Sequence, residues 1–216
     1  MKLSENTLTV LKNFAAINSG VVLSPGKKQR TISPEKSILV EAVLDDDIPS
    51  EFGIYDLNQF LGIFTFLKNP EITFGGNQVV LDDGELKFTY RGCSTNLIIT
   101  TDKELVLKNI TTKFSLANAT SQKLIRIATL SNLPNLSVIG KDGDLLLKIH
   151  EKASDTSNDG VQKIGDYAGQ DFVASFKTEN LKFLPDDYNV EIQAGAFAKF
   201  VNVNNNLTYF IALETK

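Results

Sequence analysis

The feature that most constrains the fold is an order of elements that the chain uses twice. In each half, an amphipathic helix pattern is followed by short strand patterns, a second short helix and further strands. The helices are predicted at 4–17 and 56–67 in the first half, and at 117–131 and 178–184 in the second. A chain that repeats one unit forms either two packed domains or part of a ring.

Strands are predicted where β-favouring residues lie between turn signals. In the first half they cover 21–23, 37–44, 71–74, 78–81, 85–91 and 96–101, with a turn at 24–29. In the second half they cover 136–140, 145–150, 172–176, 188–193, 197–203 and 207–213, with a polar loop at 154–160. The segment 102–112 has no helical pattern, so we predict domains at 1–106 and 107–216 and an α+β fold.

Composition limits the class of protein. With 216 residues, 42% hydrophobic and 22% charged, the chain has the balance of a soluble globular protein of one large or two small domains. The net charge of −4 excludes a wholly basic nucleic-acid binder but not a local basic surface. A single cysteine excludes an internal disulfide, no signal peptide is visible, and no apolar run approaches the ~20 residues of a membrane span.

Catalytic signals are weak. The sequence has no GxxxxGK[ST] or GxGxxG phosphate-binding motif. Cys93 and His150 leave a nucleophile pair as one interpretation, against a buried thiol and an ordinary strand histidine as the other. The acidic runs at 45–47, 82–83 and 186–187 suit either a hard cation or local backbone bonding beside turns. We expect no enzyme, no catalytic residue, no metal and no cofactor.

The polar faces of the helices carry basic residues. Lys12 lies on the polar side of the first helix, opposite Val10, Leu11, Phe14 and Ile17. Arg126 and Lys123 lie on the third helix, and Lys177 and Lys182 lie at the fourth. From spacing alone, lysines on a solvated face are the simpler interpretation.

Three segments carry a resemblance to a known family: Met1-Lys2-Leu3-Ser4, the run Leu11-Lys12-Asn13-Phe14-Ala15-Ala16-Ile17-Asn18-Ser19-Gly20, and Ile54-Tyr55-Asp56-Leu57-Asn58-Gln59-Phe60-Leu61-Gly62-Ile63. The chain resembles the sliding clamps of tailed bacteriophages, which are DNA polymerase processivity factors. The likeness continues more thinly through Leu124-Ile125-Arg126, Lys141-Asp142-Gly143, Gly165-Asp166-Tyr167, Leu184-Pro185 and Tyr209 to Glu214.

The resemblance implies the DNA clamp fold, with two similar domains that each pack two helices on antiparallel sheets. It implies a homotrimer joined head to tail into a ring around double-stranded DNA, tethering the DNA polymerase in the cytoplasm of the infected host. An ATP-driven clamp loader, a role in late transcription and no membrane association belong to the same implication. The alternative is a β-rich phage structural or host-interaction protein without DNA contact.

Three sets of site residues follow from the resemblance. The DNA-facing set departs from the family at Glu5 and Thr129, where basic residues are expected. The second set is a pocket for a partner peptide, and the third is a subunit interface formed by strand edges. The sets are Lys12, Lys123, Arg126, Lys177 and Lys182 for DNA; Leu105, Val106, Leu107, Pro185, Ile211 and Leu213 for the pocket; and Asn96, Leu97, Ile98, Val161, Gln162 and Ile164 for the interface.

Overall fold

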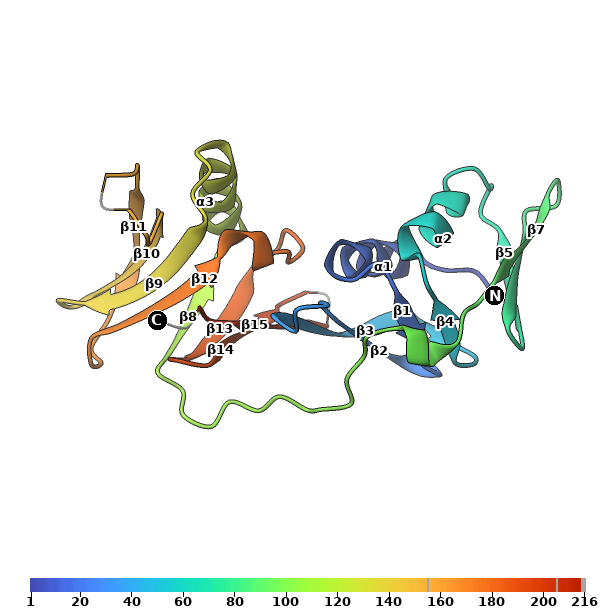
Figure 1. The fold of residues 1–216 in the computed structure, drawn as a ribbon, viewed down its shortest axis with the longest axis horizontal. Coiled ribbons are helices and arrows are strands. Elements are labelled where there is room, and N and C mark those ends of the chain that lie inside the picture. The colour runs from blue at the N-terminus through green and yellow to red at the C-terminus, as the bar shows by residue number, and fades with distance from the viewer. Residues whose placement is uncertain (155, 205, 215–216) are drawn as a thin grey trace. The chain divides into compact units, whose positions relative to one another are not determined.

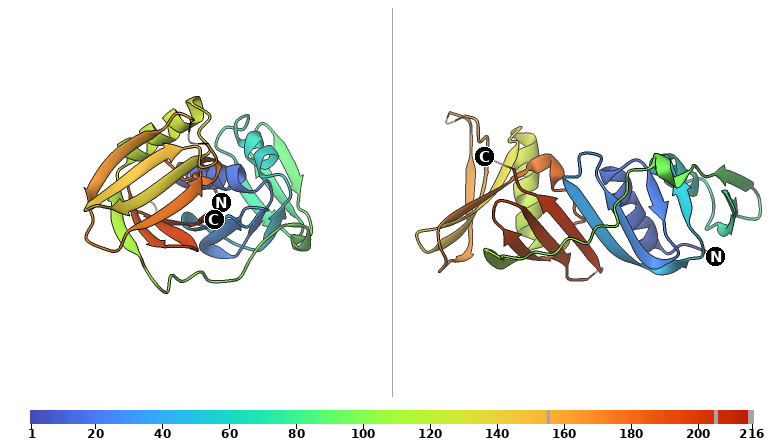
Figure 2. Two further views of the ribbon diagram at one scale, coloured as in Figure 1. Left: turned by 60° about the vertical axis from the view of Figure 1, so that its left-hand side comes forward. Right: turned by 60° about the horizontal axis from the view of Figure 1, so that its bottom comes forward.

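The computed structural model describes residues 1–154, 156–204 and 206–214 and divides the chain into two compact units, 1–103 and 104–216. The predicted division at 106 falls in the segment without regular structure that precedes the first strand of the second unit. Figure 1 labels the elements and Figure 2 gives two further views of them. Both units place helices on antiparallel sheets, as the α+β prediction requires.

The first unit contains two helices and seven strands among its described residues. Helices α1 and α2 pack against one another (Figure 1). The sheets are the antiparallel pairs β1–β4 and β2–β3 and the meander β5-β6-β7. The elements are α1 (Glu5–Ile17), β1 (Val21–Leu23), β2 (Gly26–Ile32), β3 (Ile38–Ile48), β4 (Phe52–Ile54), α2 (Leu57–Phe64), β5 (Glu71–Gly75), β6 (Gln78–Asp82), β7 (Lys87–Arg91) and the 3₁₀ turn η1 (Thr95–Leu97).

The second unit packs helix α3 against two four-stranded stretches of antiparallel sheet, in the orders β11-β10-β9-β12 and β15-β14-β13-β8. Side chains from both stretches and from α3 meet in its core. The elements are β8 (Thr112–Leu116), α3 (Asn118–Leu130), β9 (Asn135–Lys141), β10 (Asp144–His150), β11 (Gly160–Asp166), β12 (Phe172–Lys177), the 3₁₀ turn η2 (Thr178–Asn180), β13 (Tyr188–Gln193), β14 (Phe197–Asn202) and β15 (Leu207–Ala212).

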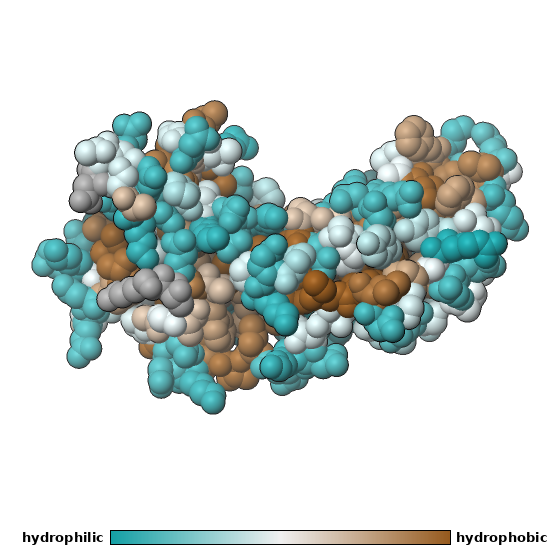
Figure 3. All heavy atoms as spheres, viewed as in Figure 1, coloured by the Kyte–Doolittle hydropathy of each residue, from teal (hydrophilic) through white to brown (hydrophobic). Residues whose placement is uncertain are grey.

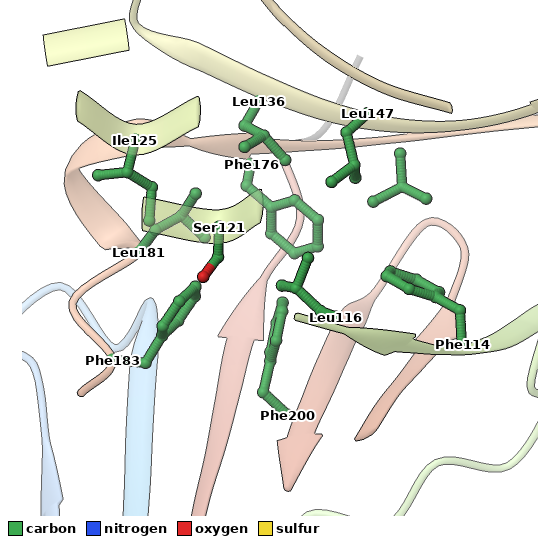
Figure 4. Close-up of a pocket in the computed structure, with 11 residues that line it drawn as sticks. Phe114, Leu116, Ser121, Ile125, Leu136, Leu147, Phe176, Leu181, Phe183 and Phe200 are labelled. Carbon is green, nitrogen blue, oxygen red and sulfur yellow. The ribbon is translucent and has the colours of Figure 1, made fainter. Parts of the chain in front are cut away.

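The core of the second unit encloses a cavity of about 20 Å³ (Figure 4). Ile125 and Ser121 reach it from α3, Phe176 from β12 and Phe200 from β14. A void of this size has room for about one water, but its lining is almost wholly apolar, so a water there would lack polar partners. The cavity is therefore a packing defect of the core and not a ligand site.

The helix predicted at 178–184 is wrong beyond its first turn. Only that first turn is helical, as the 3₁₀ turn η2. Leu181 and Phe183 are both buried on either side of exposed Lys182, in irregular backbone that follows η2. The backbone of Leu184 is held by two buried tyrosines: its N–H donates to Tyr209 Oη at 3.2 Å, and its carbonyl accepts from the Tyr188 hydroxyl. Pro185 also disfavours helical geometry at the preceding residue.

Several other strand and helix boundaries differ from the prediction. The sequence predicts a turn over 24–29, but β2 begins at Gly26. Only two residues separate β1 from β2. At this break the buried side-chain amide of Gln29 accepts from the Ser24 N–H at 2.8 Å and donates to the Ser24 C=O at 2.7 Å, so it takes the place of a strand partner. The sequence pattern also misses β4, β8 and β11, and α2 ends at Phe64 instead of residue 67.

Candidate nucleic-acid interface

Helices α1 and α3 occupy equivalent places in the two units, and several of their buried and exposed positions correspond. At one constant offset, buried Thr7, Val10 and Phe14 of α1 correspond to buried Ser121, Leu124 and Ala128 of α3. The same offset aligns their solvent-facing stripes, which we call the α1 stripe and the α3 stripe. The α1 stripe is Glu5, Thr9, Lys12 and Ala16, and the α3 stripe is Ala119, Lys123, Arg126 and Leu130.

The alignment makes Lys12 and Arg126 equivalent positions, one in each unit. Both are exposed, as is Lys123. Among the described residues, no carboxylate forms an ion pair with any of these three cations. Their charges are therefore available to an external anion, as the prediction of a DNA-facing set requires.

The remaining two predicted cations are placed differently. Lys177 is the last residue of β12 and its Nζ lies 3.5 Å from a carboxylate oxygen of Glu179, in an exposed ion pair. Lys182 is exposed between buried Leu181 and Phe183, in the irregular segment after η2. The structure thus brings Lys123 and Arg126 together on one helix face, while Lys177 and Lys182 come from backbone that is not helical. Their role in DNA binding stays a prediction.

Each stripe helix is anchored at its start by a carboxylate. The backbone N–H of Ser4 donates to Asp46 Oδ2 at 2.7 Å, and the equivalent N–H of Asn118 donates to Asp187 Oδ1 at 2.7 Å. Burial alone would raise the pKa of Asp46, but hydrogen bonds led by the Ser4 N–H hold that pKa below its ordinary value. A carboxylate at a helix N-terminus also interacts favourably with the helix dipole.

These contacts account for the acidic runs, for which a cation site is one of the two interpretations. Asp83 accepts from the backbone N–H groups of Leu86, Lys68 and Glu85, which lower the pKa of its carboxyl. Within residues 1–154, 156–204 and 206–214, no three His, Cys, Asp or Glu side chains gather as metal ligands would. Asp46 and Asp187 thus accept from backbone N–H groups at the starts of distant helices, and Asp83 accepts from its own turn and from Lys68. The expectation of no metal stays a prediction.

The histidine and the cysteine lie in different units. His150 Nε2 lies 2.8 Å from Ser137 Oγ, which in turn lies 2.8 Å from Ser175 Oγ. Burial lowers the pKa of His150. Cys93 bridges to the backbone of Gly53 through its own N–H at 3.0 Å. The histidine thus takes part in a hydrogen-bonded chain of serines on its own sheet, and Ser137 is fully buried, out of reach of a substrate.

The predicted peptide pocket is not gathered into one cavity. Leu105, Val106 and Leu107 lie in the irregular segment before β8, with Val106 67% exposed. Ile211 and Leu213 are buried at β15, which lies at the far end of the sheet order from β8. Pro185 is exposed. A peptide could therefore reach the connector residues and Pro185 directly, but not Ile211, and the pocket stays a prediction.

The predicted interface residues divide into two groups. Val161, Gln162 and Ile164 lie on β11, an edge of its sheet, and the Gln162 amide donates to Thr120 Oγ1 of α3 at 3.4 Å. The strand predicted at 96–101 is wrong, because Asn96 and Leu97 form the 3₁₀ turn η1 and Ile98 is buried. Those three residues present no strand edge, and their part in an interface stays a prediction.

Sequence reasoning missed an apolar surface around β7 in the first unit. Phe66, just after α2, is 87% exposed, and Leu86 and Phe88 are also exposed. The N–H of Lys68, two residues after Phe66, donates to Asp83 in the β6–β7 turn at 3.1 Å. Figure 3 shows apolar side chains gathered in several places among the hydrophilic ones. One signal was present: Phe66 follows the helical stripe of α2 without belonging to it.

The two-unit architecture is that of the DNA clamps. The PCNA of A. fulgidus, solved with the C-terminal region of FEN-1 bound, matches with a TM-score of 0.72 at 14% identity, over 100% of this chain and 97% of that one. Among the described residues, no helix combines the length and apolar character that a membrane span requires.

The sequence comparisons identify the family. The family described as DNA polymerase processivity factor matches residues 2–89. The sliding clamp of Enterobacteria phage T4 is 30% identical, covering 99% of this chain and 97% of the relative, and that of Vibrio phage KVP40 is 28% identical, covering 99% of both. The chain belongs to the phage sliding clamps, the processivity factors of DNA polymerase, and the alternative of a structural protein without DNA contact is set aside.

Proposed function

We propose that three copies of this chain close head to tail into a ring around double-stranded DNA and tether the replicative polymerase by binding alone, without catalysis. The observation that carries the proposal is the α3 stripe, where Lys123 and Arg126 stand exposed on a helix that contains no carboxylate, in a chain of net charge −4. We propose that this activity belongs to the cytoplasm of an infected bacterium, and the phage origin of the relatives supports this.

The chemistry of the stripes suits a clamp that slides. Ammonium and guanidinium groups on exposed helix faces contact phosphates, which are the same at every base pair, so they hold DNA without reading its sequence. Retention then comes from ring closure, and the direct affinity stays weak and dependent on salt. A flat helix face without a pocket of reactive groups is sufficient for this task.

Ring closure is proposed to pair β11 of one copy with β7 of the next. Both strands form edges of the described sheets, and an edge presents N–H and C=O groups that are ready to pair. Because the two edges differ, their contact is heterologous, and a heterologous contact that closes gives a cyclic ring.

Exposed apolar side chains occur beside both edges. Phe66, Leu86 and Phe88 lie around β7. On the other side, Val161 lies on β11, and Ile127 and the 83% exposed Leu130 lie on α3, which the Gln162–Thr120 hydrogen bond connects to β11. We propose that Phe66 of one copy packs on Ile127 and Leu130 of the next, at the C-terminal end of α3 beyond the DNA-facing Lys123 and Arg126, which explains why such large apolar groups are exposed in a single chain.

Partner binding is proposed at the connector, where Leu105, Val106 and Leu107 and the exposed Pro185 offer apolar contacts. The PCNA solved with the C-terminal region of FEN-1 bound supports docking of a terminal peptide on a protein of this fold. Loading by an ATP-driven clamp loader and support of late transcription belong to the same proposal, and their support is the resemblance to phage clamps.

Polymerase processivity on primed circular DNA tests the function. With the cognate polymerase and loader, the protein should lengthen the products of single binding events, and the Lys123→Glu, Arg126→Glu double variant should lose this effect while keeping its fold. Products of unchanged length with the wild-type protein would refute the clamp function. An undiminished effect of the double variant would refute the assignment of the α3 stripe to DNA.

A further inference from the structure

We infer that the two units of each chain contribute unequally to DNA binding: the α3 stripe of the second unit makes the main contact, and the α1 stripe of the first unit contributes little. A ring of three chains would then hold the duplex at three places instead of six. The inference rests on the proposed function and adds to it which half of the chain contacts DNA.

The residue equivalence between the stripes carries the argument. Lys12 and Arg126 are matched, but Thr9 stands where the second unit has Lys123, and Glu5 stands where it has Ala119. The formal charges of the α1 stripe therefore cancel, whereas those of the α3 stripe add to two positive charges. Since both helices begin at an aspartate bound to the equivalent backbone N–H, their starts do not account for the difference.

Spacing on the helix makes the difference larger. Lys123 and Arg126 are three residues apart and so are neighbours on the surface, about 5–6 Å between Cβ atoms, where their fields add. Glu5 lies seven residues before Lys12, about 10 Å along the axis, which is close to the screening length at about 0.1 M salt. Glu5 therefore weakens the attraction of Lys12 for a phosphate, and does so most at low salt.

The second helical element of each unit extends the same asymmetry. Helix α2 contains no basic residue, and its exposed side offers the neutral amides of Asn58 and Gln59. Residues 177–182, which include η2, carry the two cations Lys177 and Lys182 and the single carboxylate of Glu179. The α1 stripe is therefore neutral and α2, counted with its exposed N-cap Asp56, is negative, whereas both elements of the second unit carry more cations than carboxylates.

A matched pair of substitutions tests the inference in the full-length protein. Arg126→Ala and Lys12→Ala remove one cation each from equivalent sites of the repeat. Binding of a fluorescein-labelled 30-base-pair duplex is followed by anisotropy between about 20 and 200 mM NaCl, and the slope of log affinity against log salt falls by about 0.9 for each phosphate that the protein no longer neutralises. Arg126→Ala should make this slope less steep by at least about 1, and Lys12→Ala should change it by less than half as much.

Substitutions that make the α1 stripe more positive provide the converse test. Thr9→Lys gives the α1 stripe the residue type of the α3 stripe, and Glu5→Gln removes the opposing charge, so each should raise the affinity and steepen the slope. Glu5, Thr9, Lys12 and Arg126 are all exposed, so the thermal unfolding midpoint of each variant should match that of the wild type. An equal fall in slope for Arg126→Ala and Lys12→Ala, or an unchanged affinity for Thr9→Lys, would overturn the inference.

Failure of the proposed function gives a different result. If the wild-type protein neither binds the duplex at low salt nor stays on nicked circular DNA after loading, the clamp function fails and the inference fails with it. If the wild type is retained and supports processive synthesis while Lys12→Ala is at least as damaging as Arg126→Ala, only the asymmetry is wrong.

Discussion

The exposed phenylalanine beside β7 allows the ring proposal to be tested quantitatively. Phe66 is 87% exposed in the single chain, so its truncation to alanine removes almost no packing within the fold. If the side chain is buried when the ring closes, Phe66→Ala weakens each interface between copies by about 1.5–3 kcal/mol. Each 1.4 kcal/mol is about tenfold in a dissociation constant, so the dissociation constant of each interface should rise roughly tenfold to a hundredfold.

The assay is sedimentation velocity or light scattering over a wide range of protein concentration. The wild type should pass from monomer to trimer. Phe66→Ala weakens all three interfaces of the ring, so the midpoint concentration should rise by the three-halves power of the factor for one interface, roughly 30-fold to 1,000-fold. Thermal unfolding of the dilute monomer should change by no more than about 0.5 kcal/mol, as for other surface substitutions. Tyr55→Ala is the matched control, an aromatic residue of the same unit that is 66% exposed and has no place in the proposed interface.

A double-mutant cycle with Leu130→Ala identifies the partner of Phe66. Side chains in direct contact give an interaction energy of about 0.5 kcal/mol or more, whereas independent sites add within about that value. If Phe66→Ala and Tyr55→Ala assemble alike, the ring interface does not include Phe66. If the effects of Phe66→Ala and Leu130→Ala simply add, Phe66 packs elsewhere in the next copy.

Three further predictions concern stability. Asp46→Asn should cost about 1 kcal/mol at pH 7, because the charged carboxylate accepts from the Ser4 N–H. The folded pKa of Asp46 lies below its ordinary 3.8, so this contribution is present above the unfolded pKa and is lost as pH falls through the folded one. Urea unfolding of the wild type and of Asp46→Asn from pH 7 to 2.5 should therefore show the difference between their free energies of unfolding shrinking below about pH 4. A difference that stays constant with pH would contradict this prediction. Tyr209→Phe removes the acceptor of the Leu184 N–H and should cost about 1–3 kcal/mol in urea unfolding, whereas an unchanged midpoint would show that this N–H finds another partner. Gly140→Ala should lower the melting temperature by several degrees or yield insoluble protein, because the new Cβ would lie 2.5 Å from atoms of two aromatic rings; normal stability would mean that the rings move freely.

The sequence predicted the elements whose pattern is local and long. Helix α1 has four apolar residues at helical spacing and an N-cap at Ser4, and the structure has both, with the Thr7 N–H donating to Ser4 Oγ at 3.1 Å. Periodicity does not show which tertiary contacts override it. The helix predicted over the segment after η2 is wrong, because the tyrosines that hold Leu184 come from strands that follow it in the chain.

The candidate site was predictable in part for the same reason. The exposure of Lys12, Lys123 and Arg126 follows from the apolar spacing of their own helices. The equivalence of Lys12 with Arg126 required the burial of each helix to be known, since the two helices share little sequence. The exposure of Phe66, Leu86 and Phe88 could not be predicted, because no local pattern shows which apolar residues the tertiary fold leaves uncovered.

The two tyrosines that hold Leu184 also give the second unit an optical signal of its own unfolding. The chain contains no tryptophan, so tyrosine dominates its near-ultraviolet absorbance and emission. Burial raises the pKa of Tyr209 to about 12 and that of Tyr188 further, so both phenols stay mostly protonated in the folded unit at pH 11. At that pH, these two phenols therefore add to the absorbance near 295 nm only after the second unit has unfolded. The protein thus reports the unfolding of its α3-bearing half at alkaline pH without a label.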